Sequence, residues 1–330
     1  MFRLTYHRAL LALSLLIATS LPSKLFAAER VRASYAAINA SQSPLWVAQE
    51  RGIYAKHGLD VDLLYISSGS LNVQALVGGS VQFAAGGPAA VEARLRGIKL
   101  LIIANPLPAL ATNLVSLAEI KAISDLKGKI GGISRFGSST DQGIHYLFRK
   151  NGLNPETELK LLQFGGDANR LAALKIGRAH YTFLGAAASE QAKTQGYRIL
   201  ATAQQMGIPF PWTSVIVNES WLGANRETAY RYVKALTEAI WFMKRNRAES
   251  ERIIGKYMKI SDPRLMAVEY DFNVALLPEL PYPTLEGVRL ILENLARQTP
   301  EAGQREPREF VDSSTVDRLK REQFLESLSK

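Results

Sequence analysis

Hydroxyl side chains stand in a row in the loop GISRFGSSTDQG, residues 132–143. Gly137 lets the backbone curve tightly, and Ser138, Ser139 and Thr140 follow where a helix is expected to begin. The free N–H groups at the start of a helix and the positive end of its dipole can hold an anion. One hydroxyl is enough to cap a helix, so a structural role is the alternative. The loop lacks the Gly-Lys-Ser/Thr ending of a nucleotide-binding P-loop.

Two more polar loops, NASQS at 39–43 and SSGS at 67–70, also follow predicted strands. Ligands of open α/β sheets bind at the carboxyl ends of strands, so the three loops together predict a polar pocket. Gly87 would let the backbone approach a ligand closely, although a simple turn explains it equally well. Asp167, in the loop GGDAN, is a candidate for ligand contact or for capping the helix after it.

The signals for catalysis are weak. The four histidines show no metal-ligand spacing, and there is no G-x-S-x-G nucleophile motif. The absence of cysteine excludes disulfides, thiolate metal sites and a cysteine nucleophile. His180 falls in a predicted strand, where a packed histidine is commoner than a general base, and the polar neighbours of Trp212 make it a better ligand contact than Trp46. The sequence therefore predicts no catalytic residue, no metal and no cofactor.

The N-terminus has the pattern of an export signal. Two arginines precede an uncharged apolar run at 9–21, and Ala27 or Ala28 offers a small residue for cleavage. The run is shorter than the roughly 20 residues of a membrane-spanning helix, which argues against an anchor. With residues 1–28 cleaved as a signal peptide and no cysteine to carry a lipid, we expect a free periplasmic protein.

The composition is that of a globular chain large enough for two lobes. Of its 330 residues, 47% are hydrophobic and 21% are charged, with a formal net charge of +10. The lysines and arginines are dispersed, without a basic cluster interleaved with aromatics, so nucleic acid is not predicted as a partner. A solvated basic surface explains the charge.

Strand and helix patterns alternate from residue 31 to about 203, which predicts an α/β fold with parallel sheets. After residue 225 the pattern is helical, and Val233, Leu236, Ile240 and Met243 share one helix face. The expected strands are 31–37, 59–66, 80–86, 99–105, 113–120, 129–134, 158–164, 179–185 and 198–203. One helix is expected to begin at residue 43. The other helices expected before residue 200 cover 71–77, 88–96, 139–150, 170–176 and 186–194.

A short internal echo links the two halves of this alternating region. ALVGGSVQFAAGG and ALKIGRAHYTFLGA align with a shift of 98 residues, which places Gly87 on Gly185 and Gln82 on His180. The order of strand, small-residue loop, helix and strand also matches, which indicates two similar lobes. Because the identities are few, chance similarity is the alternative. If the echo is real, we expect Gly87 and Gly185 to face each other across a bound ligand.

Five stretches carry a resemblance to a known family: SPLWVAQERGIYAKHGLDVDL, QALVGGSVQFAAGG, ISDLKGKIGGISRFGSSTD, NGLNPETELKLLQFGGDANRLAALKIG and FVDSSTVDRL. In this order they resemble the periplasmic solute-binding proteins of ABC importers for sulfonates, taurine, nitrate and the thiamine pyrimidine precursor. The resemblance implies a two-lobed α/β fold, the type II periplasmic binding protein fold, with a ligand cleft between lobes joined by two crossover strands.

On this sequence the resemblance implies crossovers near 106–112 and 210–214. Lobe I would comprise 29–108 and 212–330, and lobe II would comprise 109–211. The cleft residues that the resemblance implies are Ser41, Gln42, Ser68, Gly69, Gly87, Ser138, Ser139, Thr140, Asp167, Gly185 and Trp212.

The sequence departs from the family pattern in two ways. Members of the family often carry Asp where Gln82 and His180 stand, which puts the usual strand environment at these positions in question. An arginine dedicated to a sulfonate or carboxylate is also not evident, and Arg135 is the nearest candidate.

We therefore expect a monomeric, non-enzymatic substrate-binding component of an ABC transporter. It would capture a small polar or anionic solute, such as a sulfonate, nitrate, a carboxylate or a pyrimidine, in the periplasm and deliver it to an inner-membrane permease. One alternative is a pyrimidine-precursor synthase on the same fold, but a chain without cysteine cannot supply the Cys-rich iron motif of that branch. Another is a periplasmic sensor that presents its ligand-bound form to a receptor.

Overall fold

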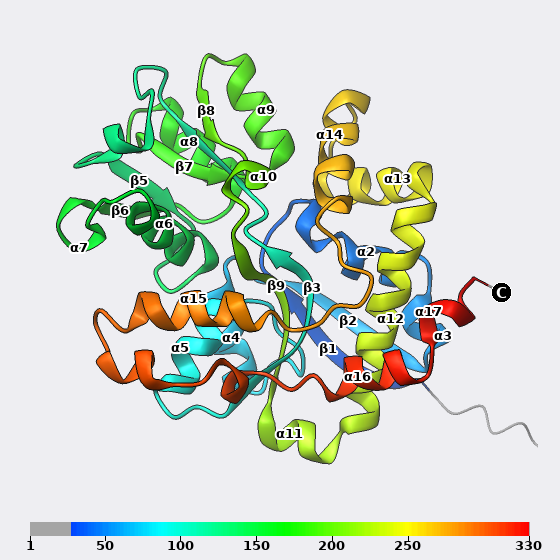
Figure 1. Cartoon of the computed structure of the whole chain (residues 1–330). Helices are drawn as coiled ribbons and strands as arrows, with labels where there is room; N and C mark the ends of the chain where they lie inside the picture. Colours follow the sequence, from blue (N-terminus) through cyan, green and yellow to red (C-terminus); the bar gives the residue numbers. More distant parts are fainter. Residues whose placement is uncertain (1–27, 330) are drawn as a thin grey trace, which may run out of the picture.

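The computed structural model describes residues 28–329 (Figure 1). The expected signal peptide, apart from Ala28, lies outside the described residues. Within residues 28–329, no helix is both long enough and apolar enough to span a membrane.

The described chain forms two α/β lobes with separate sheets. In the lobe I sheets, β1 (Glu29–Tyr35) pairs in parallel with β2 (Leu59–Tyr65), and β3 (Leu100–Ala109) pairs antiparallel with β9 (Pro209–Asn218). In the lobe II sheet the strand order is β6-β5-β7-β4-β8, from β4 (Asn113–Ser116), β5 (Ile130–Ile133), β6 (Lys160–Gln163), β7 (Tyr181–Leu184) and β8 (Arg198–Ala201).

Helices cover both lobes. Those before β9 are η1 (Ala40–Gln42), α2 (Ser43–Glu50), α3 (Ile53–Lys56), α4 (Gly69–Val77), α5 (Gly87–Leu95), η2 (Ile123–Leu126), α6 (Ser139–Lys150), α7 (Pro155–Glu158), α8 (Asp167–Lys175), α9 (Ala186–Thr194) and α10 (Ala203–Met206). Those after β9 are α11 (Glu219–Ala224), α12 (Arg226–Arg245), α13 (Arg247–Met258), α14 (Pro263–Val274), α15 (Leu285–Leu295), η3 (Pro300–Gln304), η4 (Pro307–Phe310), α16 (Ser314–Arg321) and α17 (Phe324–Ser327).

The lobe II sheet is mixed, which corrects the expectation of a parallel sheet. Strands β5, β6 and β7 are parallel, whereas β4 runs antiparallel to both β7 and β8. The parallel strands are joined through helices α6, α7 and α8, as parallel pairing requires. Strand β4 instead follows directly from β3, so its direction is set by the chain entering from lobe I.

Two strands connect the lobes. The chain leaves lobe I through β3 and returns through β9, and the two strands lie side by side in Figure 1. Their antiparallel register places Leu107 opposite Thr213 and Ala109 opposite Pro209. The predicted crossover at 106–112 covers the end of β3 and the three residues after it, and the one at 210–214 lies within β9. The boundaries at 108/109 and 211/212 remain predictions.

The predicted strand at 80–86 is wrong, because these residues make only isolated bridges. Phe83 bridges Ala33 of β1, and Ala84 bridges Ile216 of β9. The side chain of Gln82 accounts for the interrupted ladder, since its Oε1 accepts the hydrogen bond from Arg32 N at 2.8 Å in place of a backbone carbonyl. The two bridges still connect the β1-β2 pair to the β3-β9 pair.

His180 has the corresponding role in lobe II. Its Nδ1 accepts a hydrogen bond from Ile130 N at 3.0 Å, at the start of β5. This contact requires Nδ1 to be unprotonated. Gln82 and His180 thus both provide an acceptor for a backbone N–H, which an Asp at these positions would also provide.

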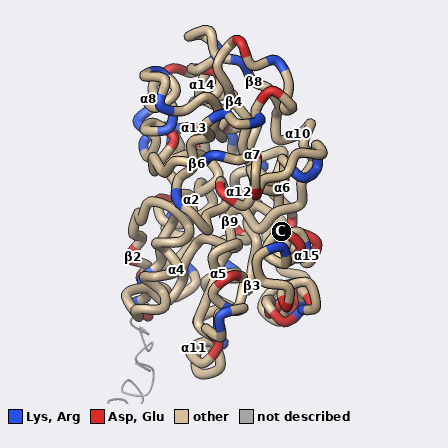
Figure 2. The backbone as a smooth tube through the Cα atoms, turned by 90° about the vertical axis from the view of Figure 1, so that its left-hand side faces the viewer, with Lys and Arg blue, Asp and Glu red and all other residues tan. Residues whose placement is uncertain are grey.

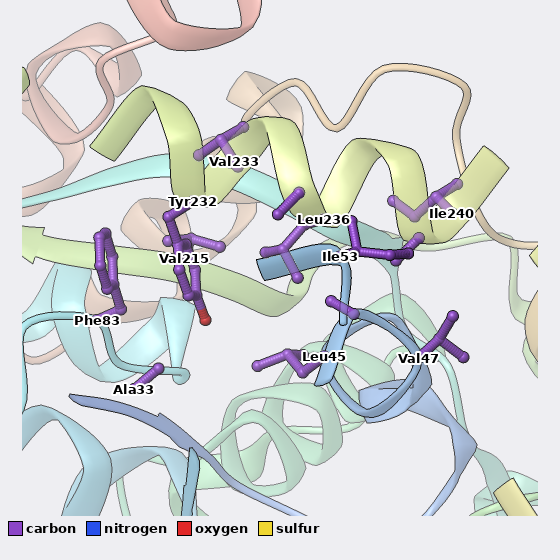
Figure 3. Close-up of a cluster of buried hydrophobic side chains, with 14 of the residues drawn as sticks. Ala33, Leu45, Val47, Ile53, Phe83, Val215, Tyr232, Val233, Leu236 and Ile240 are labelled. Atoms are coloured by element: carbon purple, nitrogen blue, oxygen red, sulfur yellow. The ribbon is translucent and has the colours of Figure 1, made fainter. Parts of the chain in front are cut away.

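The core of lobe I packs β1, β9 and α2 against α12 (Figure 3). Val233, Leu236, Ile240 and Met243 are completely buried, as the helical period predicts. Tyr232 of the same helix stacks on Phe83, with ring centroids 3.9 Å apart. This packing fixes the 83–88 segment, which leads into α5 beside β9.

Candidate ligand-binding cleft

A pocket lies where the two lobes meet. Its empty volume is about 460 Å³, open solvent included. Lobe I supplies Ala36, Ala37, Asn39, Gln42 and Gly69, the crossover β9 supplies Trp212, and lobe II supplies Ser134, Ser138, Ser139, Thr140, Gly166, Asp167 and Arg170.

Three hydroxyls form a hydrogen-bonded cluster at the start of α6. Ser134 Oγ lies 2.8 Å from Ser138 Oγ and 3.0 Å from Thr140 Oγ1, and the last two atoms are also 3.0 Å apart. Thr140 Oγ1 accepts the backbone N–H of Ser134 at 2.9 Å, and Ser138 Oγ accepts that of Asp141 at 3.5 Å. Ser138 therefore caps the helix, which is the structural role weighed for this loop.

Two backbone N–H groups and one hydroxyl at the same helix end are uncommitted. The N–H groups of Ser139 and Thr140 and the hydroxyl of Ser139 have no acceptor among residues 28–329, as expected for the first turn of a helix. Both residues line the pocket. Lobe II thus presents hydrogen-bond donors, supported by the helix dipole, to whatever occupies the pocket.

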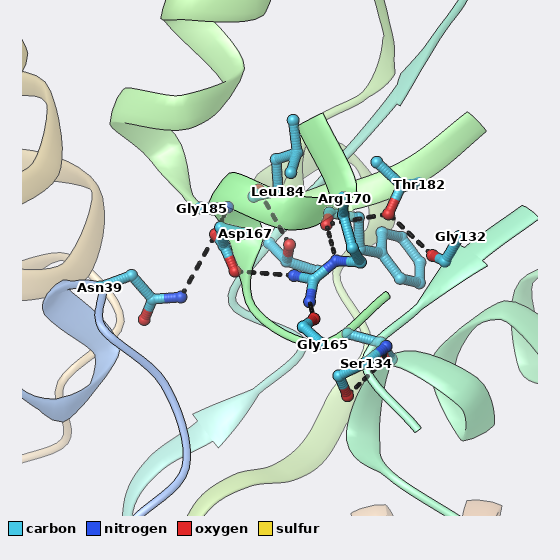
Figure 4. Close-up of polar contacts among 12 residues, drawn as sticks. Asn39, Gly132, Ser134, Gly165, Asp167, Arg170, Thr182, Leu184 and Gly185 are labelled. Carbon is cyan, nitrogen blue, oxygen red and sulfur yellow. Dashed lines mark hydrogen bonds and ion pairs between the residues drawn. The ribbon is translucent and has the colours of Figure 1, made fainter. Parts of the chain in front are cut away.

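Asp167 and Arg170 form an ion pair on the lobe II wall (Figure 4). Arg170 is only 4% exposed, and its Nη2 lies 2.7 Å from Asp167 Oδ1. The guanidinium also donates to the carbonyls of Phe183 and Gly165. Among the described residues that line the pocket, these two are the charged ones, and their charges cancel.

Asp167 also joins the lobes. Its Oδ2 accepts the backbone N–H of Gly185, just before α9, at 2.7 Å. The same oxygen lies 3.5 Å from Nδ2 of Asn39, which approaches from lobe I in Figure 4. Asp167 occupies the first position of α8, whose N-cap is Gly166, so it holds the start of α9 instead of capping its own helix.

A second buried carboxylate, Glu269 of α14, spans the same junction. Its Oε1 accepts the N–H of Ala187 in lobe II at 2.8 Å, and its Oε2 lies 3.4 Å from the N–H of Ala40 in lobe I. Burial raises the pKa of Glu269 to about 7, and the negative charge of Asp167 contributes in the same direction. Helix α14 stands beside α9 in Figure 1.

Seven predicted site residues line the pocket, namely Gln42, Gly69, Ser138, Ser139, Thr140, Asp167 and Trp212. The other four lie nearby without lining it. Ser41 contacts Gln42, and Ser68 caps α4. Gly185 donates its N–H to Asp167, whereas Gly87 packs against β9, where an added Cβ would lie 2.5 Å from the carbonyl oxygen of Pro211. The expected arrangement of Gly87 opposite Gly185 is therefore not seen at the pocket.

Sequence reasoning missed Arg170 and Asn39. Arg135, the arginine considered for an anion, is exposed and does not line the pocket. The sequence DANR does hold a signal, because Asp and Arg three residues apart on a helix form an ion pair. Asn39 lies in the NASQS loop, in which the resemblance implies only Ser41 and Gln42 as cleft residues.

Other hollows lie away from this cleft. One is lined by Ile240, Trp241, Lys244 and Arg245 of α12 with residues of the C-terminal segment. Another lies along β1 and includes Arg32 and Gln82. Within residues 28–329, no group of three or more His, Cys, Asp or Glu side chains is placed to hold a metal ion.

Two α/β lobes, two crossover strands and a pocket at their junction define the periplasmic binding protein fold. Residues 39–250 match the model of the NMT1/THI5-like family, and the chain belongs to this family. A protein of Brucella abortus (strain 2308), named as a candidate binding protein, is 28% identical over 278 residues, which cover 78% of this chain and 81% of that protein.

Solved structures show the same fold. A protein from Bordetella bronchiseptica RB50 superposes with a TM-score of 0.79 at 20% identity, covering 89% of this chain and 98% of that one. The alkanesulfonate-binding protein SsuA from Xanthomonas axonopodis pv. citri, bound to MOPS, gives 0.70 at 17% identity over 86% of this chain and 98% of that one. The periplasmic nitrate-binding protein NrtA from Synechocystis PCC 6803 gives 0.62 at 15% identity, covering 82% and 80%.

Proposed function

We propose that this protein is the substrate-binding component of an ABC importer, which captures a small polar or anionic solute in the periplasm and delivers it to a membrane permease. The observation that carries the proposal is the pocket shared by both lobes, with uncommitted donors at the start of α6. The names of SsuA and NrtA, which share the fold, support a solute of this kind.

The charge of the pocket narrows the class of solute. Because Arg170 is neutralised by Asp167, an anion would be held by N–H groups and the helix dipole and not by an unpaired cation. This arrangement suits a neutral solute or a singly charged one. Over the whole molecule, Lys and Arg are interspersed with Asp and Glu (Figure 2), which supports a small-molecule partner over nucleic acid.

Lobe closure would complete the site. Binding energy would favour the closed arrangement, with Asn39 and Asp167 brought together across the junction. The chain lacks cysteine and the family relative named above is a binding protein by name, which supports binding over catalysis.

The test is a melting-temperature screen of the chain without residues 1–27, using sulfonates, nitrate, carboxylates and pyrimidines. We expect at least one class to raise the melting temperature, because a ligand that binds the folded state stabilises it. Failure of every class to do so would contradict the proposal.

Ser139→Asp provides a site-specific variant. An Asp at the first turn favours the helix dipole, so α6 should remain folded, but its charge should repel an acceptor or anion and weaken binding at least tenfold. Ser139→Asn is the matched neutral control and should bind more tightly than Ser139→Asp. Equal binding by the two variants would place the solute elsewhere.

A further inference from the structure

Gln42 has an unusual position in the lobe I wall of the pocket. It is 2% exposed, it ends η1 at the start of α2, and it lines the pocket together with Asn39 and Trp212. Its Nε2 has two partners, Ser41 Oγ at 2.9 Å and Thr213 Oγ1 at 3.1 Å. Its Oε1 is buried and has no hydrogen-bond partner among the described residues.

The orientation of the Gln42 amide follows from the hydrogen bonds of the backbone N–H and C=O of Ser41. The N–H of Ser41 donates to Asn39 Oδ1 at 3.2 Å, so that atom is an acceptor, and the Ser41 hydroxyl, 2.6 Å from it, must donate its proton there. The Ser41 carbonyl accepts the hydroxyl proton of Thr213 at 3.0 Å. Both hydroxyls have thus used their single proton.

Two hydroxyls that have already donated can only accept from Gln42. The Gln42 atom that contacts both must therefore be the nitrogen, and turning the amide over would set its oxygen against two lone pairs. The side chain is fixed by the 39–41 segment on one side and by β9 on the other. Its Oε1 is left as a buried acceptor without a partner, on a residue that lines the pocket.

A buried acceptor without a partner has lost its hydration and gained nothing in return, and a donor from a bound molecule removes this cost. We infer that Gln42 is a specificity-determining residue whose Oε1 accepts a hydrogen bond from an N–H or O–H group of the solute. This inference rests on the proposed function and narrows its substrate class. It requires a solute that carries a hydrogen-bond donor.

The lobe II wall of the pocket requires the opposite kind of group, a hydrogen-bond acceptor, from the solute. Ser139 and Thr140 present donors at the start of α6, so they select for an acceptor or anionic group. A solute that satisfies both walls carries an acceptor at the end facing lobe II and a donor where it faces Gln42. An aminosulfonate, an amino acid or an aminopyrimidine has this arrangement, whereas an alkanesulfonate or nitrate lacks the donor.

The inference is tested with three pairs of compounds in which methyl replaces an amino group of similar size. The pairs are taurine with propane-1-sulfonate, glycine with propionate, and 4-aminopyrimidine with 4-methylpyrimidine. Dissociation constants are measured for the wild type, for Gln42→Met, and for Gln74→Met, a control at an exposed glutamine of α4. Melting temperatures without added compound report whether each variant is folded.

For each pair that binds, we expect the wild type and Gln74→Met to bind the amino compound with a dissociation constant at least tenfold lower than that of its methyl partner. In Gln42→Met we expect this preference to fall below threefold. Equal affinity for both members of a binding pair, or an unchanged preference in a folded Gln42→Met, would overturn the inference and leave the proposed function intact. Binding of none of the six compounds would overturn the inference, while the broader screen above would still decide the proposed function.

Discussion

Ser68 is a buried, strained residue next to the pocket. Its backbone has φ 82° and ψ 147°, a region that residues with a Cβ rarely adopt. Its hydroxyl caps α4 through a long contact of 3.5 Å to Leu71 N. The neighbouring Gly69 approaches Gly86 so closely that an added Cβ would lie 2.7 Å from the Gly86 Cα. This packing of α4 against α5 holds Ser68 in its strained conformation.

Ser68→Gly should be more stable than Ser68→Ala by about 1–3 kcal/mol, the usual cost of a residue held in a sparsely populated backbone region. Both variants lose the hydroxyl, so their difference isolates the Cβ. The measurement is urea unfolding of the two proteins side by side. An alanine variant as stable as the glycine variant would show that the backbone at this position is relaxed.

Gln82 and His180 should each stabilise one backbone N–H group by accepting its hydrogen bond. Gln82→Leu removes the acceptor of Arg32 N, and His180→Leu removes that of Ile130 N. We expect a loss of about 0.5–1.5 kcal/mol in each case, because neither contact is fully buried, and faster hydrogen exchange at the corresponding amide. His180→Asn, which places an oxygen near the position of Nδ1, is the control and should retain most of the protection. Unchanged exchange at Ile130 in His180→Leu would contradict the assigned contact.

Single residues of the pocket were predictable where the local sequence determines their role. Ser138 to Thr140 follow a predicted strand and begin a predicted helix, so their place at the pocket follows from local pattern. Gly87 and Asn39 depend on packing between distant segments. Gly87 is fixed by β9, and Asn39 by Asp167, more than 100 residues away in the chain in each case, and local sequence does not show such contacts.

Helix α14 joins the two lobes through Glu269. It packs on α9 of lobe II, and its carboxylate accepts N–H groups from both lobes. Asn273, one turn later on the same helix, donates to Glu269 Oε2 at 3.1 Å. Burial raises the pKa of Glu269 most, and the charge of Asp167 raises it further, so two acidic groups share the start of α9.

The raised pKa of Glu269 gives a pH dependence with a definite sign. Between about pH 4.5 and pH 7 the folded protein keeps a proton that the unfolded chain has lost. The free energy of unfolding should therefore fall as pH rises through this window, by up to about 3 kcal/mol from this group, and show no further change from it above pH 7.

The test compares Glu269→Gln with the wild type by urea unfolding at pH 5 and pH 8. We expect the fall in stability between the two pH values to be smaller in Glu269→Gln. Glu293→Gln, a change at an exposed residue of α15, should retain the full fall. An identical fall in all three proteins would contradict the role of Glu269.

Helices and strands were predictable where the spacing of apolar residues within one continuous stretch of sequence determines them. The apolar stripe of α12 and the alternation of strand and helix are properties of neighbouring residues, and both are observed. The 80–86 strand was wrong because the Gln82 side chain replaces a backbone acceptor. The antiparallel direction of β4 depends on the route of the chain between lobes, which periodicity does not report.

The molecule as a whole brings the two lobes together over a small pocket. Lobe I contributes a fixed acceptor at Gln42, and lobe II contributes donors at the start of α6. Asp167 and Glu269 each make contacts on both sides of the junction. The resemblance of the sequence to solute-binding proteins correctly indicated this architecture, since the family and the fold both agree with it.

The decisive measurement is a crystal structure of the chain without residues 1–27, together with a compound that raises its melting temperature. We expect the compound to lie between the lobes, within hydrogen-bond distance of Ser139 N or Thr140 N on one side and of Gln42 Oε1 on the other. A compound bound outside this pocket, for example in the hollow along α12, would contradict it.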